Sequence, residues 1–248
     1  MRTLLEDTLS GLEVRTTGQG APLILVHGIQ GTRAAWEPVL PYLADRLCIL
    51  PNLPGRARSP RCAQAEDEAM AAFYHLDHYA DLLAALVRRC AQQYHAPVSL
   101  AGWSMGVSVI LRLWARHGGA DLGRLVLISG TPCAAQANWF GAVAVQAVVA
   151  EAQARAQRLG LTQVADPLAV AWTWRSARAL DQRDVLPSIN LPTLVLHGQD
   201  DQDSPLAHGE MLARGIPGAQ WRLLPGQAHA VLATASAEVG NALRDFLG

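Results

Sequence analysis

Short, uninterrupted apolar runs alternate along this chain with longer segments in which apolar residues recur every three or four positions. The runs are rich in Val, Ile and Leu, as in parallel strands that are covered on both faces. They lie at residues 22–26, 47–50, 98–101, 125–128, 193–196 and, more weakly, 221–224. Helical spacing is found at residues 34–44, 76–94, 105–117, 206–213 and 235–246. This alternation predicts an α/β fold with a mostly parallel, doubly wound sheet between two layers of helices.

Two regions depart from the alternation. Residues 3–8 and 12–17 flank a turn at Ser10-Gly11, which predicts an antiparallel pair of strands at the start. Residues 129–191 contain no strand-like run and are rich in alanine with helical spacing. We therefore expect an α/β core from residues 1–131 and 189–248, and a helical cap, residues 132–188, inserted above the carboxyl edge of the sheet.

Composition narrows the class of protein. The chain has 248 residues, of which half are hydrophobic and 17% are charged, and its net charge is -1. This balance predicts one globular domain with a large core, and it gives no electrostatic reason to expect nucleic acid or an anionic membrane as a partner. The four cysteines have neither C-x-x-C nor metal-ligand spacing, so we expect no disulfide framework, no metal and no cofactor. Acidic residues near the start and the lack of a long apolar run predict a cytoplasmic protein.

The segment Gly102-Trp103-Ser104-Met105-Gly106 carries the strongest chemical signal, because it joins a predicted strand to a predicted helix. G-x-S-x-G at such a junction is the pattern of a nucleophile elbow. The turn is so tight that the residues two positions from the serine need to be nearly free of side chain, and both are glycine. We predict Ser104 as the nucleophile, with the Met105 N–H beside its oxygen.

A serine hydroxyl needs a base to remove its proton. Of the eight histidines, His229 lies in a small-residue loop between the last predicted strand and helix, at the sheet edge where the elbow lies. The alternative is an ordinary exposed loop histidine. His27 and His197 end predicted strands, so we expect them to be structural.

The acid that orients the base is expected after the strand at residues 193–196. Three candidates occur there: Asp200, Asp201 and Asp203. The spacing of Asp201 from Gly198 and Pro205 favours it, and the other two fit turn or helix-cap positions.

An oxyanion that develops during acyl transfer needs hydrogen-bond donors. The loop His27-Gly28-Ile29-Gln30-Gly31 follows an inner strand. We expect it to present the Ile29 N–H opposite that of Met105.

With the order Ser104, Asp201, His229, the chain resembles the α/β-hydrolase family over nearly its full length. A narrower resemblance links it to the pimeloyl-[acyl-carrier protein] methyl ester esterases of biotin synthesis. Four segments carry this resemblance, and the first is the elbow with its tryptophan. The second is Asn52-Leu53-Pro54-Gly55-Arg56-Ala57-Arg58-Ser59, which is similar to a D-L-P-G-x-G-x-S loop. The other two are Ser129-Gly130-Thr131-Pro132-Cys133 and Gln227-Ala228-His229-Ala230. The chain departs from the pattern at Asn52, which replaces aspartate, and at Ala57, which replaces glycine.

The resemblance implies a serine carboxylesterase that forms an acyl-enzyme on a small ester, free or presented on an acyl-carrier protein. We expect Trp103, Trp139, Phe140 and Trp172 to line the substrate pocket, although the cap aromatics would equally serve to pack the cap onto the body. A thioesterase, a lactonase and a C–C bond hydrolase share the same triad and remain alternatives. A catalytically silent ligand-binding protein is disfavoured, because nucleophile, acid, base and oxyanion loop all occur.

Overall fold

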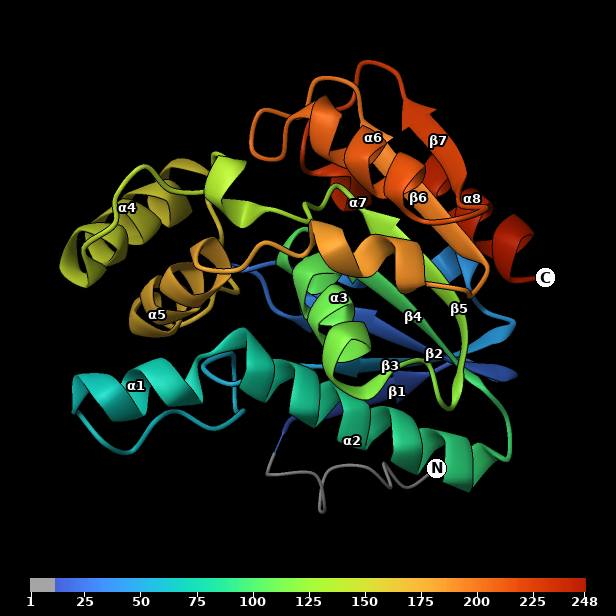
Figure 1. Cartoon of the computed structure of the whole chain (residues 1–248), viewed down its shortest axis with the longest axis horizontal. Coiled ribbons are helices and arrows are strands. Elements are labelled where there is room, and N and C mark those ends of the chain that lie inside the picture. The colour runs from blue at the N-terminus through green and yellow to red at the C-terminus, as the bar shows by residue number, and fades with distance from the viewer. Residues whose placement is uncertain (1–11) are drawn as a thin grey trace.

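The computed structural model describes residues 12–248, which contain a seven-stranded sheet in the order β1-β3-β2-β4-β5-β6-β7 (Figure 1). Strand β1 is antiparallel to β3, and all other neighbours are parallel. The strands are β1 (Val14–Thr17), β2 (Ala21–Val26), β3 (Arg46–Pro51), β4 (Val98–Trp103), β5 (Leu122–Ile128), β6 (Thr193–Gly198) and β7 (Gln220–Leu224). The mostly parallel, doubly wound sheet predicted from the sequence is confirmed.

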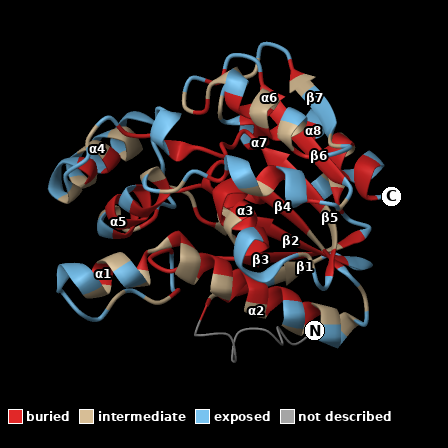
Figure 2. Ribbon diagram, in the orientation of Figure 1, coloured by how far each residue is buried: buried red, intermediate tan, exposed pale blue. Residues whose placement is uncertain are grey.

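Helices cover both faces of this sheet. The α-helices are α1 (Asp67–Phe73), α2 (Leu76–Tyr94), α3 (Met105–His117), α4 (Val145–Arg158), α5 (Pro167–Arg178), α6 (Leu206–Gly215), α7 (Val231–Thr234) and α8 (Ser236–Leu247). Because side chains alternate along a strand, Ile24 and Val26 pack with α2 and α3, whereas Leu23 and Leu25 pack with α8 on the other face. The five inner strands are accordingly buried along most of their length, whereas the edge strands β1 and β7 are more exposed (Figure 2).

The sheet order reverses around β2, which pairs with β3 on one side and β4 on the other. In doubly wound sheets, ligands bind where the order reverses, outside the carboxyl ends of the strands. Val26 and Gly102 are register partners at the ends of β2 and β4. The loops that follow these two strands therefore start side by side.

Between β5 and β6 the chain leaves the sheet and forms two 3₁₀ turns, η3 (Ala134–Gln136) and η4 (Arg183–Ser188), with α4 and α5 between them. The two helices pack on each other and stand to one side of the sheet (Figure 1). The insertion is closed at its neck by a bridge between Cys133 and Asp181 and by a 2.8 Å hydrogen bond from the Gln182 N–H to the Pro132 carbonyl.

Some local expectations are corrected. The helix expected at residues 34–44 is two short 3₁₀ turns, η1 (Arg33–Trp36) and η2 (Leu40–Tyr42). Pro38 and Pro41 explain the difference, because each lacks the N–H that an α-helix needs. The strand expected at 12–17 shortens to β1, and its expected partner at 3–8 lies outside the described residues. Among the helices of residues 12–248, none is long and apolar enough to cross a membrane.

Candidate active site

Ser104 occupies the sharp turn between β4 and α3 with a positive φ of 56°, a conformation that side chains rarely adopt. Its N–H donates a 2.9 Å hydrogen bond to the Ile128 carbonyl, which holds the turn against β5. A Cβ on Gly102 would lie 2.6 Å from the Gly106 carbonyl carbon, and one on Gly106 would clash with the Val26 carbonyl. Both glycines are therefore required by the close approach of backbone, as the elbow pattern predicts.

The structure brings the three residues of the predicted triad together. His229 Nε2 lies 2.9 Å from Ser104 Oγ, and its Nδ1 lies 2.9 Å from Asp201 Oδ2. A carboxylate can only accept hydrogen bonds, so Nδ1 of His229 carries the proton that faces Asp201. In the neutral ring Nε2 is then unprotonated and can accept the proton of the serine hydroxyl. The Asp201 side chain is fully buried and that of His229 is mostly buried. This chain of hydrogen bonds is the arrangement that makes a serine hydroxyl nucleophilic.

Of the three candidate acids, Asp201 is the one whose carboxylate contacts Nδ1 of His229. Its Oδ1 also accepts hydrogen bonds from the N–H groups of Asp203 (3.0 Å) and Ser204 (2.8 Å), so its orientation is fixed. Asp200 is exposed. Below the loop, His197 Nε2 donates a 2.7 Å hydrogen bond to the Ser204 carbonyl. Burial lowers the pKa of His197, and a neutral ring that supports the acid loop fits the structural role expected for it.

Asp203, the third candidate, has a different partner. Its carboxylate forms an ion pair with Arg155 of α4, and its Oδ2 lies 4.0 Å from His229 Nε2. Arg155 also donates a 3.1 Å hydrogen bond to the Trp139 carbonyl. The pair joins the acid loop to the inserted helices at the edge of the triad. No local pattern in the sequence predicts this ion pair, because the two residues lie 48 positions apart.

The two predicted oxyanion donors lie at the nucleophile. Met105 is the first residue of α3, where the helix offers its N–H groups no internal partner. The second loop approaches from β2, and a Cβ on Gly28 would lie 3.2 Å from Ser104 Cβ. Ile29 follows Gly28 and lines the cavity above Ser104.

His27 fixes the peptide group that carries the Ile29 N–H. Its Nδ1 donates a 2.8 Å hydrogen bond to the Gly28 carbonyl, and its Nε2 accepts a 3.1 Å bond from the Leu53 N–H. In a trans peptide the C=O and the following N–H point in opposite directions. The Ile29 N–H therefore points away from the His27 ring. Burial, together with the positive charge of Arg56, lowers the pKa of His27 to about 3, so the ring is neutral.

The buried neutral His27 gives stability a pH dependence. An unfolded histidine binds a proton below about pH 6.5, whereas the folded one does so only near pH 3. The unfolded state thus holds more protons between these values, so the free energy of unfolding falls as the pH falls, by at most about 1.4 kcal/mol per pH unit from this residue. Urea unfolding at several pH values is expected to show a shallower loss for His27→Asn than for wild type. Equal slopes would contradict a neutral His27.

A cavity of about 590 Å³ opens over Ser104 and His229. Three of the four aromatic residues predicted for the substrate pocket line it: Trp103, Trp139 and Phe140. Trp103 also holds the loop of His229, since its Nε1 donates a 3.0 Å hydrogen bond to the His229 carbonyl. Trp139 and Phe140 are almost fully buried and pack against Trp174 of α5, so they join the inserted helices to the cavity wall.

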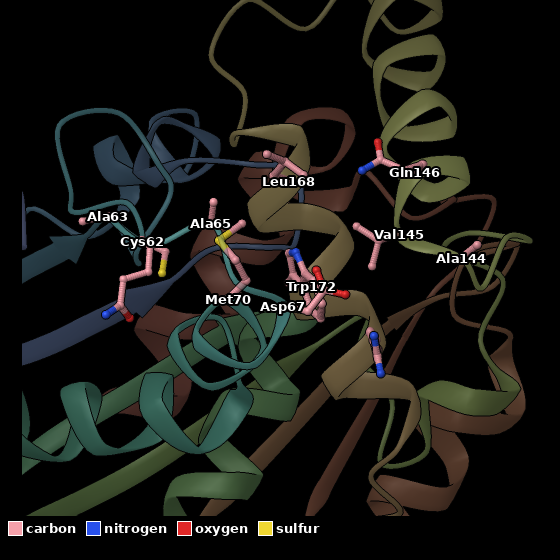
Figure 3. A pocket seen from close by; sticks show the side chains of 12 residues that line it. Cys62, Ala63, Ala65, Asp67, Met70, Ala144, Val145, Gln146, Leu168 and Trp172 are labelled. Atoms are coloured by element: carbon pink, nitrogen blue, oxygen red, sulfur yellow. The ribbon is translucent and has the colours of Figure 1, made fainter.

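Trp172 does not reach this cavity, which corrects the expectation for it. It lines a second hollow of about 670 Å³ between α1, α4 and α5, together with Met70 and Val145 (Figure 3). Its ring lies 5.1 Å from the guanidinium carbon of Arg175. Two residues along a helix turn the side chain by about 200°, so Trp172 faces this hollow while Trp174 faces Trp139.

Among residues 12–248, no cluster of three or more His, Cys, Asp or Glu side chains has the arrangement of a metal site. The polar groups that surround Ser104 are the His229 ring, the Asp201 carboxylate behind it, and the backbone at Ile29 and Met105.

Residues 23–242 match the model of the alpha/beta hydrolase family, and the chain belongs to this family. It is 26% identical over 268 residues to a pimeloyl-[acyl-carrier protein] methyl ester esterase of Aeromonas hydrophila, with 96% of this chain and 99% of the relative covered. It is 28% identical over 262 residues to a non-heme haloperoxidase of Rhodococcus erythropolis, with 91% of each chain covered. The solved structure of an esterase from Exiguobacterium antarcticum is similar in fold, with a TM-score of 0.77, 20% identity and 95% of each chain covered. The enzyme class predicted from the sequence, an ester hydrolase, agrees with the names of the esterases among these proteins.

Proposed function

We propose that the protein is a serine carboxylesterase. One observation carries the proposal: a continuous hydrogen-bond chain runs from Asp201 through His229 to Ser104 Oγ, at the base of a cavity of about 590 Å³. Such a chain generates a nucleophile beside a space large enough for a small ester.

In the proposed reaction, Ser104 Oγ attacks the ester carbonyl carbon while His229 Nε2 takes the hydroxyl proton. The carbonyl oxygen becomes an anion between the N–H groups of Ile29 and Met105. The tetrahedral intermediate then expels the alcohol, which receives the proton from His229, and leaves an acyl group on Ser104. Water, activated by the same histidine, releases the acid and restores the enzyme.

The cavity wall suggests the kind of substrate. Trp103, Trp139 and Phe140 offer apolar surface, worth about 25 cal/mol per Å² buried, which binds an acyl chain but discriminates little between its polar groups. We propose that residues 132–188 act as a cap over the site, because Phe140 and the end of α4 lie on the cavity wall. Short to medium acyl chains with a small alcohol fit this volume.

The relatives named as pimeloyl-[acyl-carrier protein] methyl ester esterases motivate a more specific proposal for this chain. A methyl ester carried on an acyl-carrier protein would be its natural substrate, with the acyl chain threaded into the cavity beside Ser104.

A substrate panel tests the proposed function. We expect kcat/KM on methyl and p-nitrophenyl esters of short to medium acids to exceed that on matched acyl thioesters and lactones by at least about tenfold, which corresponds to about 1.4 kcal/mol of transition-state binding. The measurement is initial rate against substrate concentration for each member of the panel. Faster turnover of thioesters or lactones would assign the site to one of those classes instead. Complementation of a strain that lacks the methyl ester esterase tests the carrier-linked substrate separately.

A further inference from the structure

Arg56 is a buried charge beside the oxyanion loop. Its side chain is fully buried, and among residues 12–248 no carboxylate forms an ion pair with it. It donates hydrogen bonds to the carbonyls of Ile29 (2.7 Å) and Pro54 (2.6 Å) and to the Tyr79 hydroxyl (2.6 Å). Burying a cation without a counter-charge is costly, and such groups cluster at functional sites.

Together with the contacts of His27, these hydrogen bonds hold the backbone of the loop that carries Ile29. Three successive carbonyls of the loop each accept a hydrogen bond: Gly28 from His27, Ile29 from Arg56, and Gln30 from the Ala165 N–H at 2.9 Å. The peptide planes on both sides of the Ile29 Cα are therefore held. Because only φ and ψ rotate in the backbone, holding both planes sets the direction of the Ile29 N–H.

The same network reaches the inserted helices. The Tyr79 hydroxyl lies 2.9 Å from Thr173 Oγ1 on α5, and the Asp166 N–H donates a 2.9 Å hydrogen bond to the Gly55 carbonyl. Gln30 Nε2 donates a 2.8 Å hydrogen bond to the Ala152 carbonyl on α4. The loop that carries Ile29 is thus connected to both α4 and α5.

We propose that Arg56 is a positioning residue for the oxyanion hole. It holds the Ile29 N–H toward the reacting oxygen, and its positive charge is a counter-charge for the oxyanion that forms in the intermediate. The inference rests on the proposed serine esterase function. A charge that has no carboxylate partner among the described residues stabilises the anion more than the neutral ester, and interactions of this kind raise kcat.

Arginine suits this position better than lysine. Its planar fork reaches a carbonyl on one side and a carbonyl and a hydroxyl on the other, and it stays charged when buried. The next residue, Ala57, has a positive φ of 46°, a conformation that favours the glycine of the related loop pattern. The backbone geometry of that loop is therefore kept while the side chain at position 56 brings a charge to the carbonyl of Ile29.

The test compares Arg56→Met and Arg56→Lys with the matched control Arg58→Met, an exposed arginine of the same loop. Three quantities are measured: kcat and KM on a p-nitrophenyl ester, Ki for an alkyl trifluoromethyl ketone, and Kd for the corresponding non-reacting ether. The ketone forms a charged hemiketal with serine, and the ether reports ground-state binding. Circular dichroism and thermal unfolding check the fold of each variant.

We expect Arg56→Met to lower kcat and the affinity for the ketone in parallel, by about 10²-fold, the effect of losing one oxyanion donor. The ether affinity should stay within about twofold, Arg56→Lys should recover part of the loss, and Arg58→Met should behave as wild type. Wild-type kcat in a folded Arg56→Met variant would overturn the proposal, as would equal losses for ketone and ether. If Arg56→Met does not fold, Arg56→Lys decides by the same comparison of ketone with ether.

The two proposals fail in different ways. If the wild-type enzyme itself forms no hemiketal with the ketone, the serine mechanism is wrong. If the wild type binds the ketone tightly and Arg56→Met binds it equally well, the mechanism stands and the role of Arg56 does not.

Discussion

Replacing Ser104 with alanine is expected to reduce kcat by about 10⁴–10⁶-fold, because triad members act as a unit and the base has no nucleophile to activate. The fold should be retained, since the hydroxyl contacts His229 at the cavity and alanine keeps the Cβ that the serine already places there. Steady-state hydrolysis of a p-nitrophenyl ester measures the loss, and thermal unfolding checks the fold.

Ser108→Ala is the matched control for this experiment. Ser108 lies one turn further along α3, is equally buried, and donates its hydroxyl to the Thr131 carbonyl at 3.3 Å. Its variant is expected to lose a little stability and keep its activity. Near-wild-type turnover by Ser104→Ala, or an equal loss in both variants, would remove Ser104 from the mechanism.

Asp201→Asn is expected to lower kcat by about 10⁴-fold, the second largest effect, because an amide can donate to His229 Nδ1 and so favour the wrong tautomer of the ring. Asparagine has nearly the same volume as aspartate, so packing around the buried side chain is little disturbed. The loss is measured as kcat on the same ester.

Asp200→Asn and Asp203→Asn are the controls that assign the acid. Asp200 is exposed and its variant should retain full activity. Asp203→Asn removes the ion pair with Arg155, and a much smaller loss is expected because Asp203 lies 4.0 Å from the other ring nitrogen of His229. A greater loss in either control than in Asp201→Asn would show that the assignment of the acid is wrong.

The sequence predicted those features that depend on local pattern. Buried parallel strands are continuous apolar runs, and each of the six expected runs falls within an observed strand. Ser104 could be placed because an elbow needs glycine at fixed positions on both sides. Asp201 and His229 could be placed because loops after parallel strands meet at one edge of the sheet, so position along the chain implies position in space.

Features that depend on tertiary contacts could not be predicted in this way. Trp172 and Trp174 both lie on a helix of the insertion, and the packing of α5 on its neighbours decides which of them faces Trp139. The residues of the segment at 34–44 have helical spacing, but two prolines limit it to 3₁₀ turns.

Arg56 is the most instructive omission. In the sequence it is an arginine between glycine and alanine in a loop, a context typical of an exposed side chain. Its burial follows from the carbonyls of Ile29 and Pro54, which lie in the loops after β2 and β3 and converge only when the sheet forms. Arg56 occupies a variable position of the D-L-P-G-x-G-x-S pattern, so comparison with the pattern does not single it out.

Covalent labelling tests the central claim, a nucleophilic Ser104, most directly. The native protein is treated with a fluorophosphonate, digested and analysed by mass spectrometry, with heat-unfolded protein as the control. We predict a single stoichiometric adduct on Ser104 of the native enzyme, its absence in the unfolded control, and its loss in Ser104→Ala. Rapid labelling of a different residue, or no labelling of native protein that hydrolyses esters, would contradict the account.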